Sequence, residues 1–125
     1  MPLVSAQLKS SELFSLAGKT VVLTGASGFL GRTFARTLLA NGARVVAIGR
    51  SERLMREAEG WCAEFGSDNV SVHRVDMYDV PALGQTLDQI VDEERSIDVL
   101  VNNAHELGPG TGFNVPEGSL VRYGV

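Results

Sequence analysis

The sequence predicts an α/β fold of three layers, with a parallel β-sheet between two layers of helices. Short apolar runs rich in β-branched residues alternate with longer segments whose apolar residues recur at helical spacing. The short runs are apolar on both faces, which is typical of strands buried on both sides of a parallel sheet. A glycine-rich turn joins the first run to the first helical segment. These observations together favour a nucleotide-binding type of α/β domain.

Four strands are predicted from the apolar runs. The first, Thr20–Thr24, ends directly at a glycine, and the second is Arg44–Ile48. The third is Val70–Val75 and the fourth is Ile97–Val101. Right-handed crossovers leave few topologies for such a chain. The strand order 3-2-1-4 follows if a ligand lies at the switch point between the first and fourth strands.

Three amphipathic helices are predicted between these strands. Their apolar residues recur at helical spacing over residues 30–39, 54–65 and 83–91. Asn41-Gly42 and Gly66 are typical helix stops, and Pro81 is tolerated because it falls in the first turn of the third helix. Residues 1–18 read as a leader with one helical turn around Ser11–Leu16. Residues 105–125 read as a loop-rich segment.

Composition excludes several classes of protein. The 125 residues suit one domain, and 44% apolar with 21% charged residues is ordinary for a soluble protein. A net charge of −4 without a run of Lys or Arg argues against a nucleic-acid surface. One cysteine cannot form an intrachain disulfide, which favours the cytoplasm. No apolar stretch approaches the roughly 20 residues of a membrane helix, and no signal peptide is evident.

The glycine-rich turn carries the strongest functional signal. Gly25, Gly28 and Gly31 stand between a strand and a helix inside a βαβ unit, the context that a dinucleotide-binding turn requires. We expect Gly25 to form the tight turn, Gly28 to allow close approach of a pyrophosphate, and Gly31 to allow close helix–strand packing. Ser27 is expected to offer its hydroxyl to a phosphate or to cap the helix. A glycine-rich hairpin is the alternative reading.

The end of the second strand bears on the choice of cofactor. NAD-specific sites place Asp or Glu there, whereas this chain has Gly49 followed by Arg50 and Ser51. An arginine beside the adenosine ribose suits a 2′-phosphate, so NADP is predicted in preference to NAD. The alternative is a solvated arginine that opens the next helix.

Polar residues also follow the third and fourth strands. Asp76-Met77 ends the third strand, and Asn102-Asn103-Ala104 ends the fourth. Ligands of open α/β sheets bind at these carboxyl ends. Asp76 is therefore expected to accept from an adenine amino group while Met77 packs on the ring. A simple turn formed by Asp76 is the alternative.

These motifs together resemble the short-chain dehydrogenase/reductase family. The resemblance rests on Thr24–Gly31, Asp76-Met77 and Val101–Ala104, and covers roughly residues 15–104. It implies a Rossmann-type fold, with residues 19–104 as an NAD(P)-binding half-domain. The cofactor-binding residues that it implies are Gly25, Ala26, Ser27, Gly28, Phe29, Leu30, Gly31, Arg50, Ser51, Asp76, Met77, Asn103 and Ala104. Asn102 and Asn103 are also expected to lock the central strands together.

The sequence departs from the family pattern in ways that limit the prediction. The Gly-x-x-Gly-x-x-Gly spacing is that of the extended, nucleotide-sugar branch, and His105 stands where glycine is usual. The catalytic serine and Tyr-x-x-x-Lys of the family have no counterpart, and Tyr123 receives no role. We therefore assign no catalytic residue and expect residues 105–125 to lead into a catalytic half outside this sequence. His73 and His105 lack metal-ligand spacing, so no metal site is predicted.

The resemblance implies an NAD(P)-dependent oxidoreductase. It would transfer hydride between nicotinamide, preferably of NADP, and a small alcohol or ketone, with sugars among the candidates. The chain would supply the cofactor-binding part and be inactive alone, and the full protein would be a cytoplasmic homo-oligomer. The alternatives are a non-catalytic dinucleotide-binding remnant and a nucleotide-sugar epimerase or dehydratase.

Overall fold

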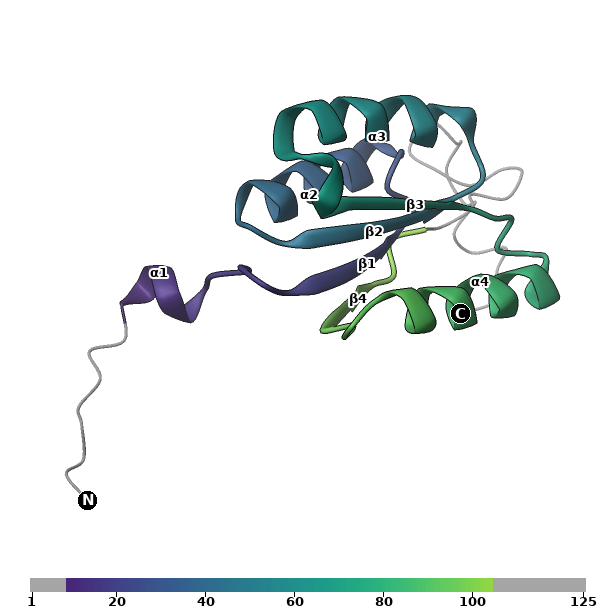
Figure 1. Cartoon of the computed structure of the whole chain (residues 1–125). Helices are drawn as coiled ribbons and strands as arrows, with labels where there is room; N and C mark the ends of the chain where they lie inside the picture. The colour runs from purple at the N-terminus through teal and green to yellow at the C-terminus, as the bar shows by residue number, and fades with distance from the viewer. Residues whose placement is uncertain (1–8, 105–125) are drawn as a thin grey trace, which may run out of the picture.

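The computed structural model describes residues 9–104 as a parallel β-sheet flanked by helices (Figure 1). Its elements in chain order are α1 (Ser10–Leu13), β1 (Thr20–Thr24), α2 (Phe29–Ala40), β2 (Arg44–Gly49), α3 (Glu52–Phe65), the 3-10 turn η1 (Ser67–Asn69), β3 (Val70–Arg74), α4 (Val80–Glu93) and β4 (Val99–Val101). The three long helices that were predicted are all present. His105, Tyr123 and the predicted loop over 105–125 lie outside the described residues, as do residues 1–8 of the predicted leader.

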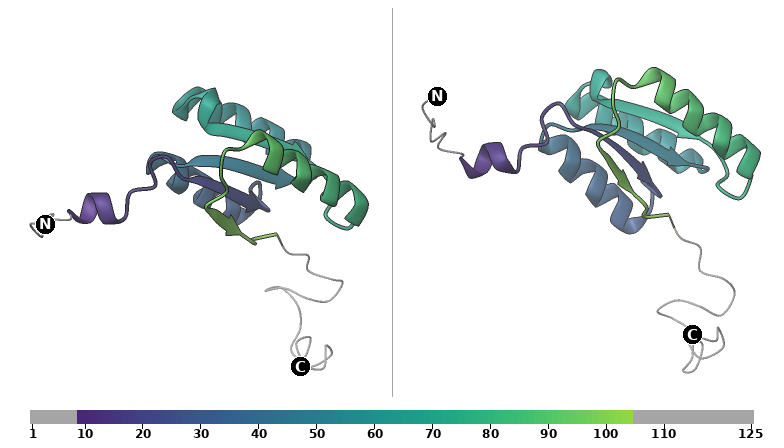
Figure 2. Two further views of the ribbon diagram at one scale, coloured as in Figure 1. Left: turned by 60° about the horizontal axis from the view of Figure 1, so that its bottom comes forward. Right: turned by 90° about the horizontal axis from the view of Figure 1, so that it is seen from below.

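The sheet has the order β3-β2-β1-β4, and every pair of neighbouring strands is parallel. This confirms the predicted order and the α/β class. Helices α2 and α3 cover one face and α4 covers the other, as Figures 1 and 2 show from three directions. The change of direction in the strand order falls between β1 and β4, which is where open sheets of this kind bind ligands.

The two faces of the sheet carry separate hydrophobic clusters. Leu23 of β1 packs with Trp61 and the other buried residues of α2 and α3, whereas Val22 packs with Ile90 of α4. All five residues of β1 are buried, and so are the four central residues of β2. Burial on both faces explains why these runs contain no alternation of polar and apolar residues.

Local contacts explain where the helices begin and end. Ser51 caps α3 by accepting a hydrogen bond from the Leu54 amide, and Asp79 caps α4 in the same way. Pro81 lies in the first turn of α4, as predicted. Gly66 ends α3 with φ +95°, a conformation that residues with a Cβ rarely adopt.

Several strand boundaries differ from the predicted ones. Strand β2 extends to Gly49, and β3 ends at Arg74 because the chain turns at Asp76. Strand β4 begins at Val99 instead of Ile97. At that point the Asp98 carboxylate accepts a hydrogen bond from the Thr20 amide at 2.8 Å, so a side chain replaces the backbone partner.

The helical turn predicted near the N-terminus is also shifted. It forms as α1 over Ser10–Leu13 and ends at Phe14, short of the predicted Leu16. Nothing in α1 is buried, so no packing against the sheet extends it. Figure 2 shows α1 standing apart from the sheet and its covering helices.

Candidate functional site

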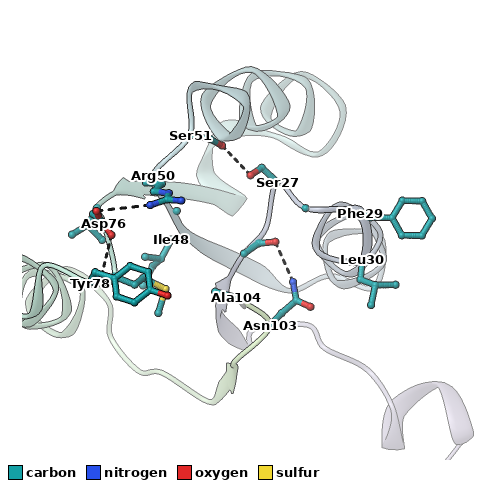
Figure 3. Close-up of a pocket in the computed structure, with 15 residues that line it drawn as sticks. Ser27, Phe29, Leu30, Ile48, Arg50, Ser51, Asp76, Tyr78, Asn103 and Ala104 are labelled. Carbon is teal, nitrogen blue, oxygen red and sulfur yellow. Dashed lines mark hydrogen bonds and ion pairs between the residues drawn. The ribbon is translucent and has the colours of Figure 1, made fainter. Parts of the chain in front are cut away.

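A cleft of about 1020 Å³ opens at the carboxyl ends of the strands (Figure 3). Its walls come from the segments that follow β1, β2, β3 and β4. The lining residues are Gly25, Ser27, Gly28, Phe29, Leu30, Ile48, Gly49, Arg50, Ser51, Val75, Asp76, Met77, Tyr78, Asn103 and Ala104. A cleft of this size, mostly apolar with a few convergent polar groups, is typical of a small-molecule or cofactor site.

The structure brings most of the predicted residues to this cleft. The turn after β1 forms one wall, and Arg50 and Asp76 stand on the opposite side from Phe29 (Figure 3). Ala26 was also predicted to line the site, and Gly31 to allow close helix–strand packing; both are buried and do not line the cleft. They lie behind the lining, where small residues let the turn and α2 pack closely.

Gly25 is required by both conformation and contact. Its φ of +65° lies in the left-handed region. A Cβ built on Gly25 would stand 2.8 Å from the Ala104 Cα and 2.9 Å from the Ala104 backbone nitrogen. The turn after β1 therefore touches the segment after β4 directly, and only glycine allows that approach.

Gly31 and Gly28 serve different geometric needs. A Cβ on Gly31 would run into the carbonyl oxygen of Gly25, so the first turn of α2 packs against the turn before it without room for a side chain. A Cβ on Gly28 would meet only the Gly25 carbonyl oxygen, at 3.3 Å. Gly28 lines the cleft and is the N-cap of α2, so a ligand can approach its backbone closely.

Ser27 does not cap α2, contrary to one of the two roles expected for it. The N-cap is Gly28, with no side-chain hydrogen bond. The Ser27 hydroxyl instead lies 3.1 Å from the hydroxyl of Ser51, which caps α3 (Figure 3). This contact joins the turn after β1 to the start of α3. Both hydroxyls line the cleft and remain within reach of a ligand.

Arg50 and Asp76 face each other across one side of the cleft. The Arg50 Nη1 is 4.0 Å from the Asp76 Oδ2, and the two side chains are 63% and 50% exposed. Asp76 also forms the turn considered as its alternative role: Oδ1 accepts from the Tyr78 amide at 3.0 Å, and its carbonyl accepts from Asp79. The turn leaves Oδ2 of Asp76 facing the cation.

The ends of β1 and β4 are joined by a compact set of hydrogen bonds. Thr24 Oγ1 accepts from the amides of Asn103 and Ala104 at 3.1 and 3.0 Å, and the Asn103 Nδ2 donates to the Gly25 carbonyl at 3.1 Å. The contact between the central strands that was expected of Asn102 and Asn103 is thus formed by Asn103 with Thr24. The Asn102 side chain makes no hydrogen bond to another residue within 9–104.

Sequence reasoning missed four lining residues. Ile48, Gly49, Val75 and Tyr78 contribute to the cleft although none was predicted to. Tyr78 is the most exposed of the four. It directly follows Asp76-Met77, and this adjacency is the signal from which it could have been predicted. Ile48 and Val75 are buried core residues that also line the cleft, which an apolar pattern cannot reveal.

Within the described residues, other candidate chemistry is sparse. No group of three or more His, Cys, Asp and Glu side chains converges there. His73 lies 3.8 Å from a Glu93 carboxylate oxygen on the face of α4, away from the cleft. Cys62 packs against the hydrophobic cluster under α3. No helix in residues 9–104 is long and apolar enough to cross a membrane.

The family model described as short chain dehydrogenase matches residues 19–114. The chain belongs to the short-chain dehydrogenase family. A "Short chain dehydrogenase/reductase dpmpG" from Macrophomina phaseolina is 37% identical over 95 residues, which are 76% of this chain and 54% of the relative. The 3-oxoacyl-[acyl-carrier-protein] reductase FabG of Vibrio harveyi is 36% identical over 90 residues, 72% of this chain and 35% of that enzyme.

Solved structures of other proteins share the fold. The L-sorbose reductase of Gluconobacter frateurii, complexed with NADPH and L-sorbose, has a TM-score of 0.67 and 28% identity. The match covers 74% of this chain and 35% of the reductase. The N-domain of a bacterial malonyl-CoA reductase with NADP has a TM-score of 0.69 and 35% identity, over 76% of this chain and 18% of that one. This chain thus spans about half or less of the length of these proteins.

Proposed function

We propose that residues 19–104 form the cofactor-binding unit of an NADP-dependent oxidoreductase. The observation that carries the proposal is the convergence of the glycine turn, Arg50 and Asp76 on one cleft at the switch point of the sheet. NADP-bound and NADPH-bound relatives of the same fold support it. Residues 1–18 and 105–125 lie outside this unit.

Each wall of the cleft has a part in this proposal. The pyrophosphate would lie against Gly28 and the N-terminus of α2, where amides without helical partners can donate to phosphate oxygens. The adenosine ribose would lie near Arg50 and Ser51. The adenine would lie between Asp76 and Met77, and Asn103 with Ala104 would border the ribose on the β4 side.

The residues present fit such a cofactor in two respects. The volume of the cleft is at the upper end of the range typical of ligand and cofactor sites. Gly49 occupies the end of β2, where an acidic side chain would repel a 2′-phosphate, and Arg50 next to it supplies a positive charge. NADP is therefore proposed ahead of NAD.

A bound nicotinamide supplies the hydride chemistry, and the residues of this chain bind and orient the cofactor. The substrate proposed for the whole protein is a small alcohol or ketone, with sugars included because the sorbose reductase is among the structural neighbours. We assign no catalytic residue to this chain. A cytoplasmic location and a homo-oligomeric full-length protein remain part of the proposal.

The test is titration of the 125-residue chain with NADP and NAD by calorimetry. We expect NADP to bind more tightly. Arg50→Ala should weaken NADP binding by about 1.5–3 kcal/mol, the scale of hydrogen bonds to a charged group, and leave NAD binding nearly unchanged. Equal losses for the two cofactors would contradict the 2′-phosphate role of Arg50.

A further inference from the structure

A second hollow adjoins the main cleft at Arg50. It has a volume of about 300 Å³ and is lined by Arg50, Arg74, Val75 and Asp76. Three of these residues also line the main cleft, so the two hollows share a wall. Arg74 is the residue that belongs to the second hollow alone. Arg74 belongs to neither the glycine turn nor the Asp76-Met77 motif, so it was not predicted as a cofactor-binding residue.

Arg74 is positioned by the sheet and by Arg50 itself. It is the last residue of β3 and is paired in register with Gly49 of β2. Its Nε donates a hydrogen bond to the Arg50 carbonyl oxygen at 3.0 Å. This bond uses one of the five guanidinium N–H groups. Within residues 9–104 the two Nη nitrogens form no hydrogen bond or ion pair, so they are available to a ligand.

The charges around the hollow favour an anion. Arg50 forms an ion pair with Asp76, whose carboxylate also accepts a hydrogen bond from the Tyr78 amide. One arginine beside a carboxylate is close to neutral as a pair. Arg74 adds an uncompensated cation on the same wall. Arginine is suited to phosphate because its planar fork can donate two parallel hydrogen bonds.

We propose that Arg74 is a second ligand of the 2′-phosphate of NADP and acts with Arg50 to discriminate NADP from NAD. The inference rests on the proposed function, because it places the adenosine ribose at the end of β2. The phosphate would lie between the two guanidinium groups, over the wall that the two hollows share. Arg74 would also hold the Arg50 backbone through the bond from its Nε.

The test compares NADP and NAD affinities of three variants with those of the unaltered chain. Arg74→Gln removes the charge but keeps a donor that can reach the Arg50 carbonyl. Arg74→Lys keeps the charge without the planar fork. Arg56→Gln is the matched control, because Arg56 is an exposed residue of α3 that lines neither hollow. NAD affinity reports whether each variant keeps an intact cleft.

We expect Arg74→Gln to weaken NADP binding tenfold or more and to change NAD binding less than twofold. Arg74→Lys should retain part of the NADP affinity, and Arg56→Gln should match the unaltered chain. Unchanged NADP affinity in Arg74→Gln would overturn the inference. Parallel losses for NADP and NAD would also overturn it, since they would reduce Arg74 to a structural role.

Failure of this inference is distinguishable from failure of the proposed function. If the unaltered chain binds NADP and NAD equally, the NADP preference itself is wrong, and the role of Arg74 is wrong with it. If the unaltered chain prefers NADP and Arg50→Ala removes that preference while Arg74→Gln does not, only the role of Arg74 is wrong.

Discussion

At the scale of single residues, three glycines in one turn have three different constraints. Gly25 needs a positive φ, and Gly31 has no room for a Cβ. Gly28 lines the cleft, where the lack of a side chain leaves its backbone open to a ligand. The sequence pattern predicted this division because each glycine has a distinct place between the strand and the helix. What the pattern could not supply is the partner of Gly25, which is Ala104, far away in the chain.

Gly31→Ala is expected to destabilise the fold. The added Cβ would overlap the Gly25 carbonyl, which is backbone and cannot move aside cheaply, so we expect a loss of about 1–3 kcal/mol. The matched control is Gly60→Ala, since a Cβ at this position in α3 meets nothing within 4 Å. That variant should gain about 0.5–1 kcal/mol from helix propensity. Urea unfolding measures both, and equal effects would contradict the packing assigned to Gly31.

Thr24 was missed as a residue that shapes the site, and Asn102, which was expected to help lock the central strands, has no side-chain hydrogen bond to another residue within 9–104. Thr24 ends an apolar strand and looks like one more β-branched strand residue. Its hydroxyl nevertheless accepts hydrogen bonds from two backbone amides of the segment after β4. Such a contact depends on how distant strands are paired, which is decided by the whole sheet and is invisible in local sequence.

At the scale of elements, one ion pair fastens the start of β2 to the end of α4. Arg44 donates through Nε and Nη2 to both carboxylate oxygens of Glu94, each at 2.8 Å. The Glu94 side chain is only 7% exposed. The hydrogen bonds from Arg44 hold the pKa of the Glu94 carboxyl below its ordinary value, despite the opposing effect of burial. They also raise the pKa of Arg44.

Because the folded pKa of Glu94 is lowered, its contribution to stability is present above the unfolded pKa and is lost as pH falls through the folded value. Glu94→Gln should therefore cost about 1.5–3 kcal/mol at pH 7, and the difference from the unaltered chain should shrink below about pH 4. The control is Glu64→Gln, which breaks the exposed pair with Arg36 and should cost at most about 1 kcal/mol. Chemical unfolding at several pH values checks both. A pH-independent cost for Glu94→Gln would contradict the assignment.

The strand and helix positions were largely predictable, and their ends were not. Burial on both faces leaves a clear apolar signal in β1 and β2. The start of β4 was misplaced because Asp98 replaces a backbone partner with its side chain, which the apolar run from Ile97 does not disclose. The extent of α1 was misplaced because no tertiary contact fixes it.

At the scale of the whole molecule, the sheet has unequal edges. Among the described residues β4 pairs with β1 alone, and the side chain of Leu100 in this strand is 57% exposed. Figure 2 shows β4 at the border of the sheet. An apolar edge strand with unpaired backbone groups is a template for association.

We therefore expect the 125-residue chain to self-associate with rising concentration, and Leu100→Lys to reduce this association because a charged edge opposes pairing. Light scattering over a dilution series measures it. Val91→Lys, a similar change on the exposed side of α4 and not on the strand, is the control and should have a smaller effect. A monodisperse monomer at all concentrations would contradict the expectation.

Fold class, strand order and the location of the cleft followed from the sequence because they depend on periodicity and on a glycine turn at a fixed place in the sheet. Individual contributions such as those of Tyr78 and Arg74 did not. Tyr78 is an ordinary polar residue two positions after Asp76. Arg74 ends β3 and comes beside Arg50 only through the pairing of β2 with β3.

The most direct test of the central claim is to map NADP binding on the isotopically labelled chain by amide chemical shifts. We predict that the shifts gather at the turn over 25–31, at Arg50 and Ser51, at Asp76 and Met77, and at Asn103 and Ala104. Residues on the far side, such as those of the Arg44–Glu94 pair, should not change. Saturable shifts confined to other surfaces, or none at millimolar NADP, would contradict the assignment of this cleft as the cofactor site.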